Sequence, residues 1–92
     1  MSKSWKQEHR DVFENLLKED RDPRFILVQQ LWVLLEQHRR EKAEGNAGVA
    51  AEVLQFARTC YEKGVAQHPQ FPPDLLNRLT NLKRELDELL PG

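Results

Sequence analysis

An apolar run in the first half of the chain most restricts how it can fold. Residues 25–35 read FILVQQLWVLL, in which only the two glutamines are polar. The run is too apolar for an ordinary surface helix, and it is shorter than the roughly 20 residues that a membrane-spanning helix needs. It must therefore be buried in protein, and a chain of 92 residues has few ways to bury it.

The residues around this run predict four helices and no strand. Helices often begin at a Ser, Asp or Asn that caps the free amides, or at a proline in the first turn. Such residues recur along the chain at Ser4, Asp22-Pro23, Asn46 and Pro73. We expect helices over residues 4–20, 23–42, 46–66 and 73–90, within one domain that spans residues 1–92.

The sequence leaves two helix ends open, the start of the first helix and the end of the third. Ser4 and Gln7 have the spacing of a capping box, in which each side chain bonds the other residue's backbone amide. Gly64 either ends the third helix or lies within a helix that continues to Gln67. The three prolines of residues 68–73 predict a rigid, non-helical connection before the fourth helix.

The second helix has more apolar surface than two neighbours would cover. At 100° per residue its main apolar side spans half the circumference. Ile26 and Val33 form a thin second stripe on the other side, among glutamines. This stripe indicates a third contact, either within the chain or across a dimer.

The fourth helix carries a leucine seam with a 4-3-4-3 spacing. That spacing serves a bundle core or a dimer zipper, and in a four-helix domain the core is the favoured use. Short connections between helices favour antiparallel neighbours. The predicted fold class is therefore all-α, a four-helix bundle with antiparallel helices and short loops, with an intertwined or self-associating dimer as a further form. The seam consists of Leu75, Leu79, Leu82, Leu86 and Leu89.

Composition narrows the functional classes. Lysine and arginine total 14 and aspartate and glutamate total 15, so no global field attracts phosphate. Cys60 is the single cysteine, which excludes an internal disulfide framework. Together with an N-terminus that lacks a signal sequence, this favours a reducing, cytoplasmic location.

The residue types that carry chemistry are scattered. His9, His38 and His68 lie on three different segments, and none forms a pair that one helical turn could present to a metal. Cys60 falls on the apolar side of the third helix, where a thiol usually packs as an inert group. We therefore expect no enzyme activity, no cofactor and no metal site.

The surplus apolar stripe instead favours a non-catalytic protein–protein interaction module, such as an adaptor, assembly factor or small regulatory subunit. It would bury an apolar helix face against a protein partner or against its own copy as a homo-oligomer, with charges setting the orientation. The candidate contact residues are Ile26, Val33 and Trp32, with Gln29, Gln30 and Arg40 at the rim.

The alternative is a nucleic-acid-associated regulator. The end of the second helix holds Arg39, Arg40 and Lys42, which could contact phosphates. Positive charge there also complements the carbonyl end of the helix dipole, and the interleaved Glu41 weakens the field. Nucleic-acid binding is therefore the less favoured function, and a membrane partner is not expected.

Overall fold

The computed structural model describes residues 4–19 and 21–90, and these residues form four helices and no strand. The all-α class predicted from the sequence is therefore confirmed. The helices differ by one or two residues at some ends from the predicted ranges, and residue 20, the predicted end of the first, lies outside the described residues. They are α1 (Trp5–Lys18), α2 (Pro23–Ala43), α3 (Ala47–Gln67) and α4 (Pro73–Leu89).

Helix starts follow the local sequence in most respects. The hydroxyl of Ser4 accepts a hydrogen bond from the backbone amide of Gln7 at 3.3 Å. The Gln7 side chain does not return to Ser4 but donates to Asp11 at 3.0 Å, so only half of the predicted capping box forms. At the start of α2, the Asp22 carboxylate accepts from the backbone amide of Arg24 at 2.8 Å, as an N-cap should.

The turn between α2 and α3 depends on Gly45, whose φ of 84° is a conformation that other residues rarely adopt. Asn46 takes the N-cap position of α3, but its side chain makes no capping bond. It donates instead to the Glu41 carboxylate at 2.8 Å, which ties the turn back to α2.

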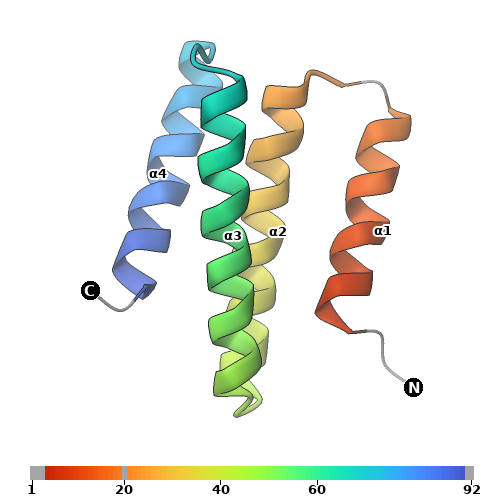
Figure 1. The fold of residues 1–92 in the computed structure, drawn as a ribbon, viewed down its shortest axis with the longest axis vertical. Coiled ribbons are helices and arrows are strands. Elements are labelled where there is room, and N and C mark those ends of the chain that lie inside the picture. The colour runs from red at the N-terminus through yellow and green to blue at the C-terminus, as the bar shows by residue number, and fades with distance from the viewer. Residues whose placement is uncertain (1–3, 20, 91–92) are drawn as a thin grey trace.

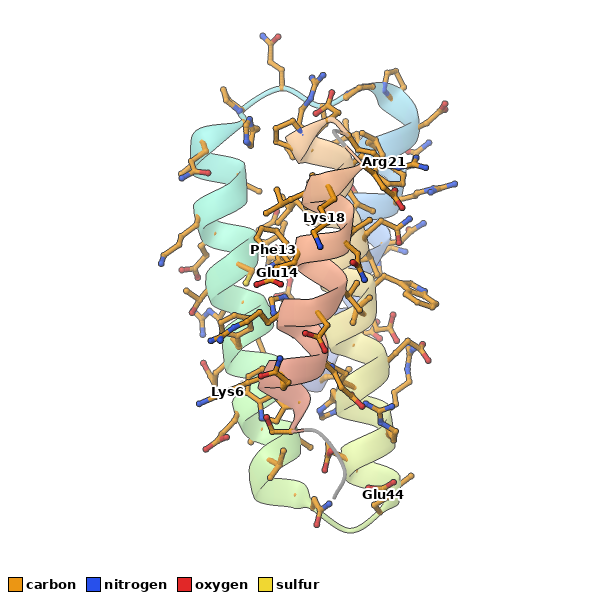
Figure 2. The ribbon with its side chains drawn as sticks, turned by 90° about the vertical axis from the view of Figure 1, so that its right-hand side faces the viewer. Lys6, Phe13, Glu14, Lys18, Arg21 and Glu44 are labelled. Atoms are coloured by element: carbon orange, nitrogen blue, oxygen red, sulfur yellow. The ribbon has the colours of Figure 1, made fainter. Side chains whose placement is uncertain are left out.

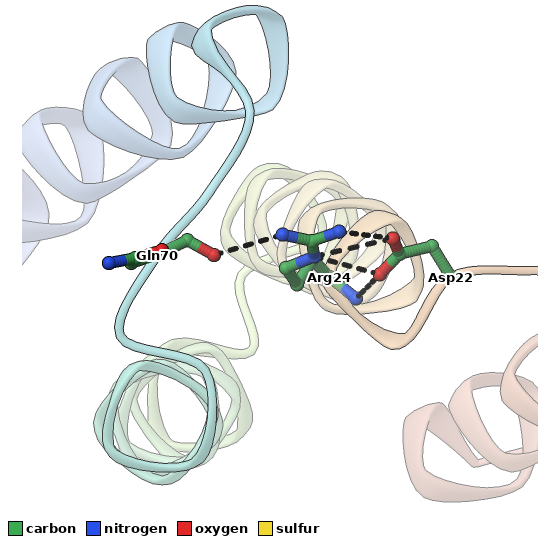
Figure 3. A network of polar contacts seen from close by, with 3 residues as sticks. All are labelled: Asp22, Arg24 and Gln70. Carbon is green, nitrogen blue, oxygen red and sulfur yellow. Dashed lines mark hydrogen bonds and ion pairs between the residues drawn. The ribbon is translucent and has the colours of Figure 1, made fainter.

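The connection between α3 and α4 is held by α2. Figure 3 shows the Arg24 guanidinium between the Asp22 carboxylate and the Gln70 backbone carbonyl, to which it donates at 3.1 Å. The hydrogen bonds from Arg24 lower the pKa of Asp22 to about 2. One residue pair thus caps α2 and fixes the proline-rich segment across 46 positions of sequence.

The four helices form a flat molecule with α2 at its centre (Figure 1). Its extents are 37 × 33 × 18 Å. The largest interface joins α2 to α3, and α2 also packs against α1 and α4. In Figure 1, α3 lies in front of α2, while α1 and α4 flank this pair on opposite sides. These contacts are compatible with a helical bundle.

The core lies where α2 meets its neighbours. The largest of its fully buried side chains are Leu31, Leu34, Leu35, Val53 and Leu86. Contact with three helices explains why the second helix is apolar over so much of its circumference. The third contact that the Ile26–Val33 stripe predicted is made within the chain by α1, which lies on the opposite side of α2 from α4 (Figure 1).

Candidate interaction site

The residues predicted to contact a partner differ in how far they are exposed. Ile26 is only 5% exposed and is covered within its own chain, where it borders a gap with Phe13 and Leu17 of α1. Figure 2 shows Phe13 on the side of α1 that faces α3. Val33 is half-buried beside α1. Ile26 is therefore unavailable to a partner in this conformation.

Trp32 is the exposed exception in the apolar run. More than half of its surface, 53%, is accessible, whereas every other apolar residue of the run is buried or half-buried. It borders two grooves, one between α2 and α4 and one between α1 and α2. We call the side of α2 that carries Gln29, Trp32, Val33, Glu36 and Arg40 the Trp32 face.

The two grooves differ in charge. The α2–α4 groove is lined by Val28, Gln29, Leu82 and Asn81, with Arg78 as its charged residue. The α1–α2 groove has a volume of about 570 Å³ and an apolar floor of Val12, Trp32 and Val33. Its rim holds three carboxylates and one guanidinium, from Glu8, Asp11, Glu36 and Arg40.

The arginines at the end of α2 are already paired. Arg40 forms an ion pair with Glu8 of α1. Arg39 forms ion pairs with Glu36 on its own helix and with Glu85 of α4. Since these pairs are largely exposed, each adds little to stability, but together they orient side chains on both flanks of the Trp32 face. Lys42 is exposed and has no ion pair among residues 4–19 and 21–90.

The two glutamines predicted at the rim of the contact, Gln29 and Gln30, have different neighbours in the structure. Gln29 is half-buried in the α2–α4 groove. Gln30 instead turns to α1, where its amide nitrogen lies 2.9 Å from His9 Nε2. An amide nitrogen can only donate, so His9 Nε2 accepts and the ring is neutral. Burial also lowers the pKa of His9.

Sequence reasoning missed Gln37, which is 4% exposed. Its amide nitrogen donates to the Trp5 backbone carbonyl at 3.1 Å and to the Glu8 carboxylate at 3.3 Å. The signal was present in the sequence, because Ile26, Gln30, Val33 and Gln37 follow a 4-3-4 spacing. That spacing places both glutamines on the stripe that α1 covers.

The other candidate residues for chemistry that the structure describes include Cys60 and His38, which are half-buried and buried. Cys60 is half-buried on α3, and burial raises the pKa of its thiol, although the nearby Lys63 charge acts in the opposite direction. A raised pKa disfavours the reactive thiolate. His38 is buried, and its Nδ1 donates to the Ala50 carbonyl at 3.0 Å. Within the described part of the chain, no cluster of three potential metal ligands occurs.

The described residues therefore form an all-helical fold in which the Trp32 face exposes an aromatic side chain on the central helix. In the described ranges, none of the helices combines the length and apolarity needed to cross a membrane. Comparison with known proteins gives no match: no family model, no curated protein sequence and no solved structure is significantly similar to this chain.

Proposed function

We propose that this chain is a non-catalytic protein–protein interaction module that binds through the Trp32 face. The observation that carries the proposal is the exposure of Trp32, 53%, within a run whose other apolar side chains are covered. Tryptophan is among the residues that most often dominate binding energy at protein interfaces, particularly near the centre of the contact. An exposed tryptophan in the middle of the central helix fits that role.

The surroundings of Trp32 support the same function. Val33 extends the apolar area, and Gln29 and Arg40 border the two grooves beside Trp32. Ion pairs hold the charged side chains on both flanks, which reduces the conformational entropy that a partner would have to remove. An apolar centre with a polar rim is the usual anatomy of a transient interface.

Several finer features belong to this proposal. The connections between helices alternate between the two ends of the molecule (Figure 1), which supports an antiparallel bundle. We also propose self-association as a homodimer, a regulatory or assembly role, and a cytoplasmic location. Support for the location is the single thiol, Cys60, which has no disulfide partner.

The alternative, phosphate contact through Arg39, Arg40 and Lys42, has less support. Two of these three cations are paired with carboxylates of neighbouring helices, Glu8 and Glu85. A phosphate group would have to displace those carboxylates. We expect no gel shift with duplex or single-stranded nucleic acid even at low salt, where phosphate contacts are strongest.

The test compares Trp32→Ser with Leu76→Ser. Leu76 lies on α4 and is 48% exposed, so both changes remove an exposed apolar side chain from a helix. We expect Trp32→Ser to reduce the free energy of self-association by roughly 2 kcal/mol or more, the loss typical of a central tryptophan. It should also reduce the amount of protein captured from the native lysate. Leu76→Ser should keep both.

Sedimentation velocity over a concentration series gives the association state, and circular dichroism verifies that helix content is unchanged. Equal losses of self-association and protein capture in the two variants would contradict specific binding through the Trp32 face. A wild-type chain that stays monomeric at every concentration and captures no protein would remove the proposal.

A further inference from the structure

Helix α1 contributes little to the core of the molecule. Among the described residues, the buried apolar cluster that forms the core contains one side chain of α1, Trp5. The other outer helix, α4, contributes Leu79 and Leu86, and further leucines of α4 pack partly buried against the same cluster. The core therefore belongs mainly to α2, α3 and α4, and α1 lies at one edge of the molecule (Figure 1).

The seam between α1 and α2 buries polar groups. In the described part of the chain three polar side chains are buried, and two of them, His9 and Gln37, lie in this seam. Gln37 donates to the Trp5 carbonyl, but its Oε1 is buried and has no hydrogen-bond partner among residues 4–19 and 21–90. The ion pair across the seam, Arg40 with Glu8, is partly exposed and adds little. The seam therefore holds α1 less firmly than an apolar contact of the same size would.

A gap borders the second half of α1. It has a volume of about 520 Å³, lies between α1, α2 and α3, and is lined on the α1 side by Phe13 and Leu17. The aromatic contacts of α1 with α3 lie nearer its start, where Trp5 and His9 meet the ring of Phe56 at centroid distances of 5.5 and 5.0 Å. Side chains that border a gap lose packing contacts, so the second half of α1 is held less firmly than the first.

The other three helices are joined to one another without α1. The interface of α2 with α3 is the largest in the molecule. Arg24 of α2 donates to Gln70 before α4, and Arg39 of α2 forms an ion pair with Glu85 of α4. These contacts and the core leucines do not depend on α1, so the three helices can stay folded as one cooperative unit while α1 moves away.

α1 covers a stripe of α2 that adjoins Trp32. We call the residues Ile26, Gln30, Val33 and Gln37 the α2 stripe, and Val33 is shared with the Trp32 face. Ile26 is 5% exposed, and both glutamines turn to α1. Opening of α1 would therefore join Ile26 and Val33 to Trp32 in one apolar surface.

The α2 stripe suits a second copy of itself. Its 4-3-4 spacing is that of a coiled-coil seam, in which the two apolar residues alternate with the two glutamines. A glutamine amide has both donors and an acceptor, so it can hydrogen-bond to a glutamine of another copy. Such a pair would also supply the donor that Gln37 Oε1 lacks within the chain.

We propose that α1 is a detachable cover: it opens as one unit from a body of α2, α3 and α4 and uncovers the α2 stripe, which then pairs with the stripe of a second copy. The closed α1 limits dimer formation, and dimer formation shifts the population towards the open state. This inference rests on the proposed self-association and adds its regulation.

The first experiment is NMR hydrogen exchange on the dilute full chain, compared with Leu86→Val. Amides of α1 should exchange at least about tenfold faster than those of the fully buried Leu34 and Ala57, because α1 opens without global unfolding. Leu86→Val removes one methylene from the core and should speed the Leu34 and Ala57 amides about three- to tenfold. It should leave the α1 amides unchanged, since α1 opens while residue 86 stays packed.

The second experiment measures dimerisation of variants by sedimentation velocity. Trp5→Ala removes the core anchor of α1 and should tighten the dimer at least about tenfold, because more chains are open. Leu86→Val weakens the body and should leave the dimer unchanged. Adding Ile26→Glu to Trp5→Ala should remove the gain, because the charge lies in the uncovered stripe. Phe13→Ala is a milder change on α1 and gives the same test where Trp5→Ala does not fold.

The outcomes separate this inference from the proposed function. Equal acceleration of all amides by Leu86→Val, or a dimer that Trp5→Ala and Phe13→Ala leave unchanged, would overturn the inference. So would a gain that Ile26→Glu does not remove. In each of those cases, loss of association in Trp32→Ser alone would leave the interaction module with a contact that does not need α1 to open.

Discussion

Two glycines of α3 have opposite structural roles. A Cβ on Gly64 would lie 2.4 Å from Leu27 Cδ2 and 2.8 Å from Cδ1, so the absence of a side chain lets α2 and α3 approach closely. Gly64 therefore lies within the helix and does not end it, because α3 continues to Gln67. Gly48 has nothing within 4 Å of the same position.

This contrast gives a prediction with its own control. Gly64→Ala should lower the free energy of unfolding by about 1–3 kcal/mol, because the buried Leu27 side chain would have to leave its present position. Gly48→Ala should raise it by up to about 1 kcal/mol, the helix-propensity difference between the two residues. Urea denaturation measures both. Stabilisation by Gly64→Ala would contradict the close contact.

At the scale of elements, the burial of the α4 leucines distinguishes between a core within the chain and a zipper between two chains. Leu79 and Leu86 are 4% and 2% exposed, and Leu75, Leu82 and Leu89 pack partly buried against the core. The seam therefore belongs to the core of its own chain. The spacing alone allowed a dimer zipper as well, because both uses need the same stripe.

Substitutions along α4 should reflect this burial. Leu86→Ala should cost about 2–5 kcal/mol of unfolding free energy, the range for a leucine that leaves a cavity. Leu76→Ala, on the exposed side, should change it by no more than about 0.5 kcal/mol. Thermal or urea unfolding compares the two. A similar small effect for both variants would mean that the seam is not packed as described.

For the whole molecule, we expect stability to depend on pH through His9 of α1. Burial lowers the pKa of His9 below its ordinary value of 6.5, so the folded state favours the neutral ring more than the unfolded state does. The stabilisation is fully present above pH 6.5 and is lost as the pH falls through that value towards the folded pKa. Asp22, with a pKa lowered from 3.8 to about 2, loses its contribution only in more acidic solution.

We therefore expect the free energy of unfolding to decrease between about pH 7 and pH 5. The double variant His9→Leu with Gln30→Leu removes the titrating ring and its amide partner together, so this slope should become smaller. Urea denaturation at both pH values measures the slope, and NMR of the imidazole gives the His9 midpoint. A midpoint above 6.5 would contradict the burial argument.

Much of the fold follows from local sequence. Caps and prolines act within a few residues, so Ser4, Asp22 and Pro73 marked helix starts that the structure has within one residue. The apolar content of residues 25–35 predicted that this run is buried in protein, and most of its apolar side chains are. Only one of the two capping-box bonds forms, because the Gln7 side chain bonds Asp11, one turn away.

The site was less predictable, because exposure depends on segments that are distant in sequence. Ile26 and Trp32 are both large apolar residues of the same run, and the sequence proposed both as contact residues. The sequence alone determined four helices, their approximate ends and a second helix with more apolar surface than two neighbours need. Only the tertiary structure decided that α1 covers Ile26 and buries Gln37 while Trp32 stays exposed, since burial is set by how whole helices pack and local signals act over a few residues.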